Sequence, residues 1–322
     1  MNGNPLITIA VPVYNTELFV RRCLDSLVNQ TIKEIEIVVV NDGSTDQSEA
    51  ICKEFAEKDS RITLICKENE GLASARQTAL EVSKGKYFCV CDSDDWVEKN
   101  MYEQLYLKAE ETDADVVMCD YWSEYQDGKQ IIYHYPLKLE ERKDLLDDAL
   151  NQRFPTMVWN KMFRRDLFER YQLSWEYGIN MGEDLLLMLK LLCNPVKIAC
   201  LTVPLYHYRR LLGGNSYTNC ISLSTFNQLL FIRKWSITNI DNIKYQNGLF
   251  IQWLDQAFAG FRVKNGMTSQ YYKESTLKNI SYSGFLNFSY PQLKGLIVLI
   301  AKIFGFKTGK SIVKIMYRYI YH

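Results

Sequence analysis

Histidine is scarce in this chain, and its cysteines are not arranged in pairs. Only three histidines occur among 322 residues, and none of the nine cysteines belongs to a Cys-x-x-Cys pair. This composition excludes the common zinc patterns, and nine cysteines in a chain of this length do not form a disulfide framework. Cys89 and Cys91 alternate with Val90 and are predicted to be small core residues. We therefore expect a protein of a reducing cytosol.

Long apolar runs are also missing. No stretch reaches the length of a membrane-spanning helix, and residues 1–5 show no basic region followed by an apolar signal core. These features add to the expectation of a cytoplasmic protein.

Acidic residues are absent from the end of the chain, where none follows Glu274. Residues 293–322 instead combine lysines with aromatic and aliphatic residues. We favour a basic amphipathic helix that makes peripheral contact with an anionic membrane surface. The alternative is a helix packed on the rest of the protein with a solvated basic side. No nucleic-acid partner is expected, because the basic region contains no recognisable binding module.

What is present indicates an α/β fold. Nearly half of the residues are apolar, which predicts a packed core. Residues 6–119 alternate short β-branched strands with helices, as in a mainly parallel, Rossmann-like sheet covered by helices. Asp127-Gly128 predicts a hairpin turn, and Glu183 and Asp184 open a helix so apolar that it must be buried. A mostly helical region follows, and a domain boundary is expected near residue 215, between residues 1–215 and 216–322.

An acidic cluster stands directly behind the apolar run of residues 87–90. Asp92, Asp94 and Asp95 fall within four residues there, and Trp96 follows. Carboxylates at the end of a buried strand are costly unless a positive charge lies against them. Oxygen ligands suit Mg²⁺ or Mn²⁺, so Asp92 and Asp94 are candidate metal ligands.

Two further polar clusters follow other predicted strands. One is Pro12-Val13-Tyr14-Asn15 with Glu17, and the other runs from Asn41 to Asp46. Because ligands bind at the carboxyl edge of an open parallel sheet, we expect all three clusters to line one crevice.

The residue types in this crevice suit a nucleotide diphosphate. Tyr14 has a ring on which a base can stack, and Asp42 is an acceptor for a base N–H or ribose hydroxyls. Arg76 can neutralise a phosphate or orient an Asp. Each residue also has a structural interpretation: Tyr14 as packing, Asp42 as part of a turn, and Arg76 as a surface ion pair.

The motifs resemble those of family 2 glycosyltransferases with the GT-A fold, closely over residues 5–125 and more loosely beyond. The resemblance is carried by Val11-Pro12-Val13-Tyr14-Asn15, Asn41-Asp42-Gly43-Ser44-Thr45-Asp46, Asn69-Glu70-Gly71-Leu72-Ala73-Ser74-Ala75-Arg76 and Asp92-Ser93-Asp94-Asp95, in that order. Trp159-Asn160-Lys161, Gly182-Glu183-Asp184 and Leu205-Tyr206-His207-Tyr208-Arg209 continue it. Gln77 stands where such enzymes often have Asn, and the Gln-x-x-Arg-Trp motif of processive synthases is missing.

The resemblance implies an inverting, metal-dependent transfer of a hexosyl or N-acetylhexosaminyl group from a UDP-sugar to an acceptor hydroxyl. The acceptor would be a saccharide or lipid-linked saccharide of a capsule, exopolysaccharide or lipopolysaccharide, used at the inner face of the cell membrane. Asp184 becomes the candidate base, while Glu183 and His207 are weaker candidates for contacting the acceptor or the diphosphate. The implied donor-binding residues are Pro12, Tyr14, Asn15, Glu17, Asp42, Asn69, Arg76, Asp92, Ser93 and Asp94.

Other functions remain open. A metal-dependent nucleotidyltransferase also uses a parallel sheet and Asp pairs, but it would need a glycine-rich loop where this chain has Pro12 to Asn15. A non-catalytic nucleotide-sugar-binding protein would keep Asp42 and Asp94 and dispense with Asp184. Glu183 and Asp184 also have a structural interpretation, as a helix cap.

Overall fold

The computed structural model of the chain describes residues 4–134, 144–210, 221–263 and 267–272. These residues divide into two compact units. The α/β unit contains residues 4–134 and 155–210, and the helical unit contains residues 144–154, 221–263 and 267–272. The boundary expected near residue 215 lies outside the described residues and stays a prediction.

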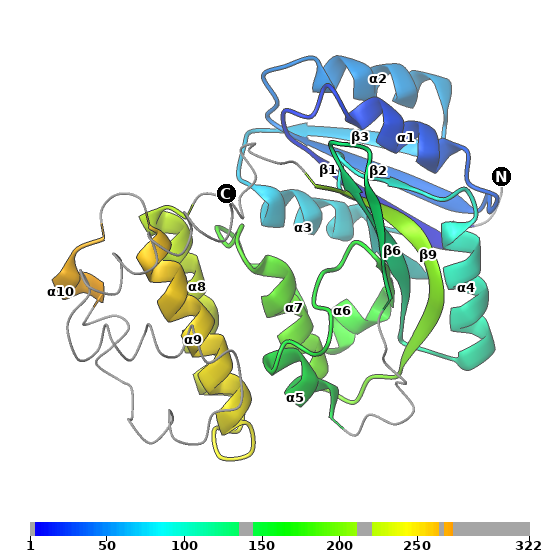
Figure 1. Ribbon diagram of the computed structural model, residues 1–322. Helices are drawn as coiled ribbons and strands as arrows, with labels where there is room; N and C mark the ends of the chain where they lie inside the picture. The colour runs from blue at the N-terminus through cyan, green and yellow to red at the C-terminus, as the bar shows by residue number, and fades with distance from the viewer. Residues whose placement is uncertain (1–3, 135–143, 211–220, 264–266, 273–322) are drawn as a thin grey trace. The chain divides into compact units, whose positions relative to one another are not determined.

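Four parallel strands form one half of the sheet, in the order β3-β2-β1-β4. They are β1 (Ile7–Val13), β2 (Ile35–Asp42), β3 (Ile62–Lys67) and β4 (Tyr87–Val90). The connecting helices are α1 (Val20–Val28), α2 (Ser48–Lys58) and α3 (Leu72–Val82). Figure 1 shows α1 and α2 on one face of these strands and α3 on the other. The predicted alternation of strands and helices is confirmed here.

The other half of the sheet is mixed. β8 (Lys161–Arg164) lies antiparallel between β4 and β6 (Val116–Tyr125), and β9 (Ile198–Arg210) runs parallel to β6. β5 (Trp96–Val97) pairs with β9, and β7 (Gln130–Tyr133) forms a hairpin with β6. Gly128 has φ +82° in this hairpin, so the predicted turn is confirmed. The strand expected to end at Cys119 continues to Tyr125, because its aromatic continuation pairs with β7 and β9.

Burial of both sheet faces explains the apolar runs of the first strands. All seven residues of β1 are buried, and so are all four of β4. Such strands read as continuous hydrophobic segments instead of alternating ones. Their side chains join the main core, in which Ile9, Val11 and Cys89 are fully buried. The core therefore fixes the strand ends, from which the site loops emerge.

Three further helices belong to the α/β unit. They are α4 (Met101–Thr112), α6 (Asp166–Arg170) and α7 (Glu183–Leu192). Along α7, Leu186 to Leu189 are all buried, as its apolar composition predicted. Only its first turn is acidic, so this buried helix presents Glu183 and Asp184 at its N-terminus.

The helical unit contains α5 (Leu145–Leu150), α8 (Leu223–Asn239), α9 (Gln246–Arg262) and α10 (Ser269–Tyr272). The Ser222 side chain caps α8 by accepting the Thr225 backbone N–H at 3.0 Å. Phe226 on α8 packs in a small core with Ala259 on α9. The helical character predicted from about residue 218 is confirmed over the described part of this region.

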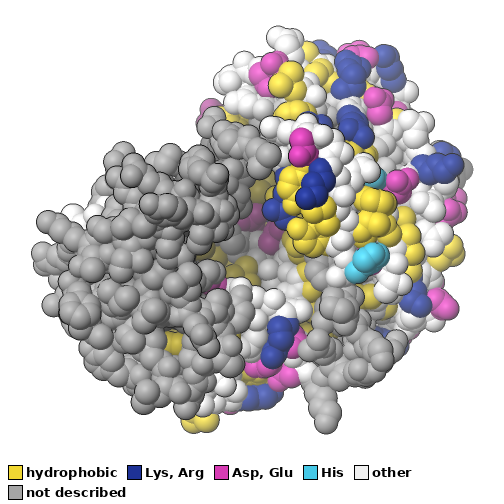
Figure 2. Space-filling model, viewed as in Figure 1, with side chains coloured by type: hydrophobic (Ala, Val, Ile, Leu, Met, Phe, Trp, Pro, Cys, Tyr) yellow, Lys and Arg dark blue, Asp and Glu magenta, His cyan; other side chains and the backbone are white. Residues whose placement is uncertain are grey.

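The charge of the visible surface and the length of the helices concern the expected contact with a membrane. In the view of Figure 2, hydrophobic side chains of the α/β unit are interspersed with both basic and acidic ones, and no large field of one sign is visible. Within the described ranges, no helix combines the length and the apolar character needed to cross a bilayer. The basic segment 293–322 lies outside the described residues, so its membrane contact stays a prediction.

Candidate active site

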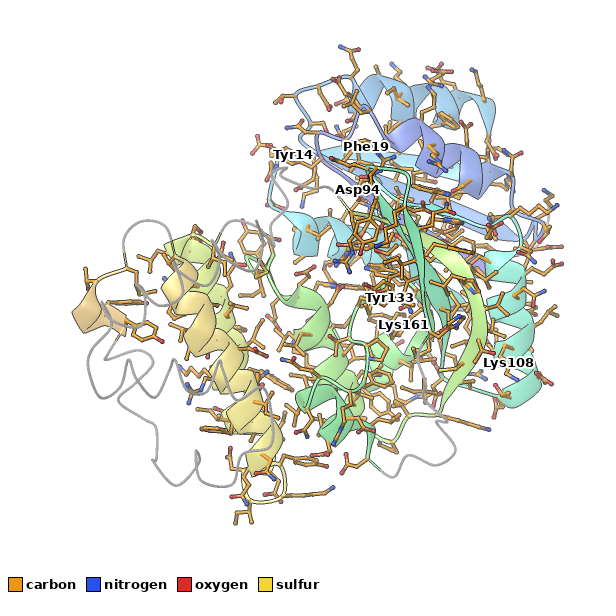
Figure 3. The ribbon with its side chains drawn as sticks, viewed as in Figure 1. Tyr14, Phe19, Asp94, Lys108, Tyr133 and Lys161 are labelled. Atoms are coloured by element: carbon orange, nitrogen blue, oxygen red, sulfur yellow. The ribbon has the colours of Figure 1, made fainter. Side chains whose placement is uncertain are left out.

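The three predicted polar clusters emerge from one edge of the sheet. β1 lies between β2 and β4, with Val13 opposite Asn41 and Ala10 opposite Val90. Neighbouring strands are about 4.8 Å apart, so β2 and β4, which lie on either side of β1, are about 10 Å apart across the sheet. A nucleoside diphosphate can span this distance. Figure 3 shows Tyr14 and Asp94 at this end of the sheet.

The first two loops are fastened to each other by their own side chains. Asn15, which has φ +51°, accepts the Thr45 N–H on Oδ1 at 2.8 Å. Glu17 accepts the Gln47 N–H on Oε2 at 2.8 Å. Asn15 and Glu17 thus hold the loop that follows β2, and their part in donor binding stays a prediction.

Other predicted donor-binding residues differ in their access to solvent. Pro12 is buried within β1 opposite Val40, whereas Tyr14 exposes 47% of its surface. Asn69 is also exposed. The arrangement leaves the Tyr14 ring accessible to a base, while Pro12 shapes the strand end.

Asp42 joins the end of β2 to the start of α3. Its Oδ1 accepts the Glu70 N–H at 3.1 Å, and its Oδ2 accepts the Gly71 N–H at 2.7 Å. The residue is only 2% exposed. Each carboxylate oxygen retains a second lone pair for a ligand N–H or O–H. Asp42 therefore fixes the start of α3 against the end of β2, and its contact with a base or ribose stays a prediction.

Arg76 connects two parts of the predicted site. Its Nη2 donates to Asp92 Oδ1 at 2.8 Å, and its Nη1 donates to Asp184 Oδ1 at 2.7 Å and to Glu183 Oε1 at 3.0 Å. The Arg76 side chain is 1% exposed. One buried guanidinium thus brings the acidic loop after β4 against the N-terminus of α7.

Charge in this cluster is unbalanced, since three carboxylates surround one arginine. Burial, together with the charge of Asp184, raises the pKa of Glu183 to about 8, although Arg76 opposes the shift. Burial also raises the pKa of Asp184, and again Arg76 acts in the opposite direction. Burial alone would lower the pKa of Arg76, but the carboxylates raise it, so the guanidinium stays charged. A pKa of about 8 favours the protonated form of Glu183 at neutral pH, so Asp184 is the better candidate for an acceptor of protons.

Asp95 anchors the acidic loop. Its Oδ2 accepts the Tyr206 hydroxyl at 2.7 Å, and its Oδ1 accepts the Arg209 backbone N–H at 2.7 Å. Ser93 is buried and its Oγ accepts the Thr16 hydroxyl at 3.1 Å. Both contacts fix the loop so that Asp92 and Asp94 stand beside each other at the edge of the sheet.

Asp94 has the properties of a cation ligand. Burial and the charge of Asp92 raise the pKa of Asp94 to about 6, while the positive charge of Arg209 lowers it. No Lys, Arg or His of the described residues forms a salt bridge with Asp94. Asp92 keeps Oδ2 available after Oδ1 has bound Arg76.

These two carboxylates fit a divalent cation. The described residues contain no cluster of three or more side chains with metal-ligand geometry. Mg²⁺ and similar ions are usually held by one or two carboxylates together with substrate phosphates. Asp92 and Asp94 therefore match a site that is completed by a diphosphate.

His207 lies in different surroundings from those predicted. Its Nδ1 lies 2.7 Å from Glu124 Oε1, and its Nε2 lies 3.1 Å from Glu98 Oε1. The ring stacks on Trp96 at 4.9 Å between centroids. Both ring nitrogens therefore face carboxylates in the structure, and a contact of His207 with the diphosphate or the metal stays a prediction.

Two residues near the site had no predicted role. Arg209 acts on Asp94 through its charge, and its guanidinium lies 4.1 Å from the centre of the Phe19 ring. Asn180 Oδ1 accepts the Ala73 N–H at 3.0 Å at the start of α3. Arg209 was visible in sequence only as the end of a motif, and nothing local marks Asn180 as a partner of α3.

Such a sheet, with an acidic loop and an acidic helix start that share one arginine, agrees with the GT-A fold expected from the motifs. Residues 8–172, more than half of the chain, match the family described as "Glycosyl transferase family 2". The chain belongs to this family, as the motifs predicted.

Individual relatives agree with this assignment. The chain is 36% identical over 219 residues to the uncharacterized glycosyltransferase EpsJ of Bacillus subtilis (strain 168), an alignment that covers 66% of this chain and 63% of EpsJ. It is 32% identical over 220 residues to the glycosyltransferase GlyG of Streptococcus pneumoniae serotype 4, covering 65% of this chain and 72% of GlyG. It is 41% identical over 213 residues to GlyA of the same organism, covering 63% of this chain but only 30% of GlyA. The chain thus spans less than two thirds of EpsJ and GlyA.

The fold is shared with solved structures. Residues 1–349 of S. aureus TarS in complex with UDP-GlcNAc superpose with a TM-score of 0.72 at 19% identity, covering 97% of this chain and 91% of that one. The GT-A fold expected from the motifs is confirmed by this likeness.

Proposed function

We propose that this protein is an inverting glycosyltransferase that moves a hexosyl or N-acetylhexosaminyl group from a UDP-sugar to an acceptor hydroxyl. The observation that carries the proposal is the contact of Arg76 with both Asp92 and Asp184. It puts a candidate base beside the candidate diphosphate site. A protein that only bound the nucleotide-sugar would not need a carboxylate held there by a buried arginine.

Asp184 acts as the general base in this scheme. It takes the proton from the acceptor oxygen while that oxygen attacks the anomeric carbon from the side opposite the diphosphate. The bond to the diphosphate breaks as the new glycosidic bond forms, which inverts the configuration. Position at the first turn of α7 favours the charged form of Asp184.

Asp92 and Asp94 would hold Mn²⁺ or Mg²⁺ together with the diphosphate. The bound ion would stabilise the negative charge that grows on the leaving UDP. Arg76 keeps Asp92 and Asp184 at a fixed separation throughout, and Tyr14 and Asp42 hold the uridine. The metal dependence and each of these roles belong to the proposal.

The donor and pathway are proposed from similarity. TarS is described in complex with UDP-GlcNAc, and a relative that is 27% identical over 255 residues is named minor teichoic acid biosynthesis protein GgaB. We infer that a UDP-hexose or UDP-N-acetylhexosamine is the donor here. The acceptor would be a saccharide, free or lipid-linked, of a bacterial surface polysaccharide, and the transfer would take place at the inner face of the membrane.

The direct test is a donor screen. The full chain is incubated with UDP-sugars, Mn²⁺ and a panel of saccharide acceptors, and release of UDP and the mass of the product are measured. Transfer with one donor, with the anomeric configuration inverted in the product spectrum, supports the proposal. Binding of UDP without transfer to any acceptor favours the non-catalytic alternative.

Asp184→Asn tests the base. General acid–base catalysis contributes about 10²- to 10⁴-fold, so turnover should fall by about that factor. Affinity for UDP, measured by calorimetry, should stay nearly unchanged. Asp166→Asn is the matched control, because Asp166 also lies in the first turn of a helix but pairs with Arg170 on the surface. A near-full rate in Asp184→Asn would remove the assignment.

A further inference from the structure

A lysine is completely buried close to the proposed base. Lys161 is the first residue of β8 and is 0% exposed. Its Nζ donates to the Met157 carbonyl at 2.6 Å and to Asn160 Oδ1 at 2.9 Å. Figure 3 shows Lys161 inside the α/β unit, in contrast to Lys108 on α4. Burying an ammonium is costly, so a specific arrangement must compensate for it.

The Met157 carbonyl belongs to the same peptide group as the N–H of Val158. That N–H donates to Asp184 Oδ2 at 3.2 Å. One planar amide thus receives the ammonium at its oxygen and offers its hydrogen to the carboxylate. Hydrogen bonds that share an amide polarise one another, so the ammonium strengthens the N–H as a donor.

Both oxygens of Asp184 are therefore held. Oδ1 is fixed by Arg76 at 2.7 Å, and Oδ2 is fixed by Val158. Arg76 also donates hydrogen bonds to Asp92 and Glu183. Of these three acids, the 157–158 peptide group donates to Asp184. The path through Lys161 is thus the more specific influence on Asp184.

The charges around the pair agree with this arrangement. Asp184 faces Arg76, Asp92 and Glu183 besides Lys161, and Lys161 also faces the thiols of Cys119 and Cys200. Burial lowers the pKa of Lys161 to about 7, while Asp184 acts to raise it. The ammonium form of Lys161 is favoured while Asp184 is charged, and Lys161 in turn favours charged Asp184.

We propose that Lys161 is a positioning residue for Asp184, acting through the 157–158 peptide group to orient the carboxylate and keep it ionised. The inference rests on the proposed function, in which Asp184 is the base. Lys161 itself touches neither donor nor acceptor in this scheme. The alternative is a purely structural role, in which Lys161 holds only the turn before β8.

The test replaces Lys161 with Met and measures kcat, KM and the pH profile. We expect kcat near pH 6.5 to fall about tenfold, part of the full effect of a general base. KM for the donor should stay within about twofold, since the ammonium does not contact it under the proposal. The acidic limb of kcat should move up by about one pH unit, because a positive charge that favours ionised Asp184 has been removed. Lys108→Met, at the surface lysine that pairs with Glu111, should change none of these quantities.

Lys161→Gln provides a milder variant should Lys161→Met fail to fold. Its amide can still donate to the Met157 carbonyl, but it carries no charge. We expect the same shift of the acidic limb with a smaller loss of kcat. A structural role predicts lower thermal stability with the pH profile unchanged in both variants, and that result would overturn the proposal.

A second readout does not depend on turnover. The amide ¹H–¹⁵N signal of Val158 should follow the ionisation of Asp184 through their hydrogen bond. Its pH midpoint should be higher in Lys161→Gln than in the wild type, and Asp184→Asn should abolish the transition. If no donor reacts with the wild type, the proposed function fails. The Val158 titration would still show whether Lys161 influences the ionisation of Asp184. Identical Val158 titrations in wild type and Lys161→Gln would refute it.

Discussion

Loss of the Arg76 side chain should destabilise the protein more than loss of any exposed arginine. Arg76→Met removes a guanidinium that lies 2.7 to 3.0 Å from Asp92, Glu183 and Asp184. Removing one partner from a buried ion pair costs about 3–5 kcal/mol, because the remaining charges lose their compensation. The side-chain exposures of 22%, 10% and 19% for the three acids leave them partly solvated, which favours the lower end of this range.

Arg21 is a suitable control. It pairs with Glu54 at 2.7 Å, but its side chain is 50% exposed and that of Glu54 is 38% exposed. Such a surface pair contributes about 0–1 kcal/mol. Arg21→Met should therefore change the free energy of unfolding by less than about 1 kcal/mol. Arg76→Lys keeps the charge but lacks the planar guanidinium that reaches acids on two sides. Its loss in the free energy of unfolding should therefore lie between those of Arg21→Met and Arg76→Met.

Urea unfolding followed by tryptophan fluorescence measures these losses. The α/β unit contains four of the six tryptophans, which are Trp96, Trp122, Trp159 and Trp175. Equal losses in Arg76→Met and Arg21→Met at pH 7.5 would refute the view that Arg76 compensates the acidic side chains around it.

The pH dependence gives a second criterion. Arg76 lowers the raised pKa values of Glu183 and Asp184, so without it these folded-state pKa values rise further above their unfolded values. Stability from such groups is fully present below the unfolded pKa and is lost as pH rises through the folded pKa. The destabilisation by Arg76→Met should therefore be larger at pH 7.5 than at pH 5. The opposite trend would contradict the reasoning.

Three further substitutions test separate parts of the site. Asp94→Asn should weaken Mn²⁺-dependent binding of UDP at least tenfold by calorimetry, because an amide is a poor substitute for a carboxylate ligand; unchanged affinity would exclude Asp94 as a metal ligand. Glu183→Gln should gain stability relative to wild type as pH rises from 5 to 8, because Glu183, with a folded pKa of about 8, keeps a proton over this range that the unfolded chain releases; parallel pH–stability curves would contradict this. Gly71→Ala should destabilise the protein more than Gly128→Ala in urea unfolding. Both glycines have positive φ, but a Cβ on Gly71 would overlap the Asn180 side chain, whereas a Cβ on Gly128 meets nothing within 4 Å. Equal losses of stability would show that the overlap with Asn180 is easily relieved.

The sequence predicted the first four strands because they carry their information locally. Both faces of β1 and β4 are covered, so burial alone requires the continuous apolar runs seen at residues 7–13 and 87–90. The polar clusters follow where these runs stop, and parallel pairing brings them to one edge. The edge could thus be predicted without any knowledge of long-range contacts.

The second half of the sheet could not be predicted in the same way. β8 has four residues, two of them Lys161 and Arg164, and it runs antiparallel between β4 and β6. Its position depends on pairing with two strands that are distant in sequence, and no local periodicity encodes that pairing. The role of Lys161 was hidden for the same reason, since a lysine in a polar motif suggests exposure.

The sequence also did not reveal the direction in which side chains point. Arg76 lies 107 residues before Glu183, and their contact depends on the placement of α3 against α7. His207 follows a tyrosine in a motif that suggested ligand binding, yet cross-strand pairing places it between Trp96 and two glutamates. A motif identifies which residue types gather at an edge, whereas packing decides which of them face a ligand.

Packing also separates the polar residues of the edge into two groups. Asn15 and Glu17 accept backbone N–H groups of the loop that follows β2, and Asp95 accepts the backbone N–H of Arg209 in β9. Tyr14 stays exposed, and Asp94 stays without a salt bridge among the described residues. Loops that are already fastened to each other lose little conformational entropy when a ligand arrives, so more of the contact energy remains as affinity. Substitution of Asn15 or Glu17 would therefore be expected to weaken the binding of a nucleotide at this edge even without a direct contact between the nucleotide and either side chain.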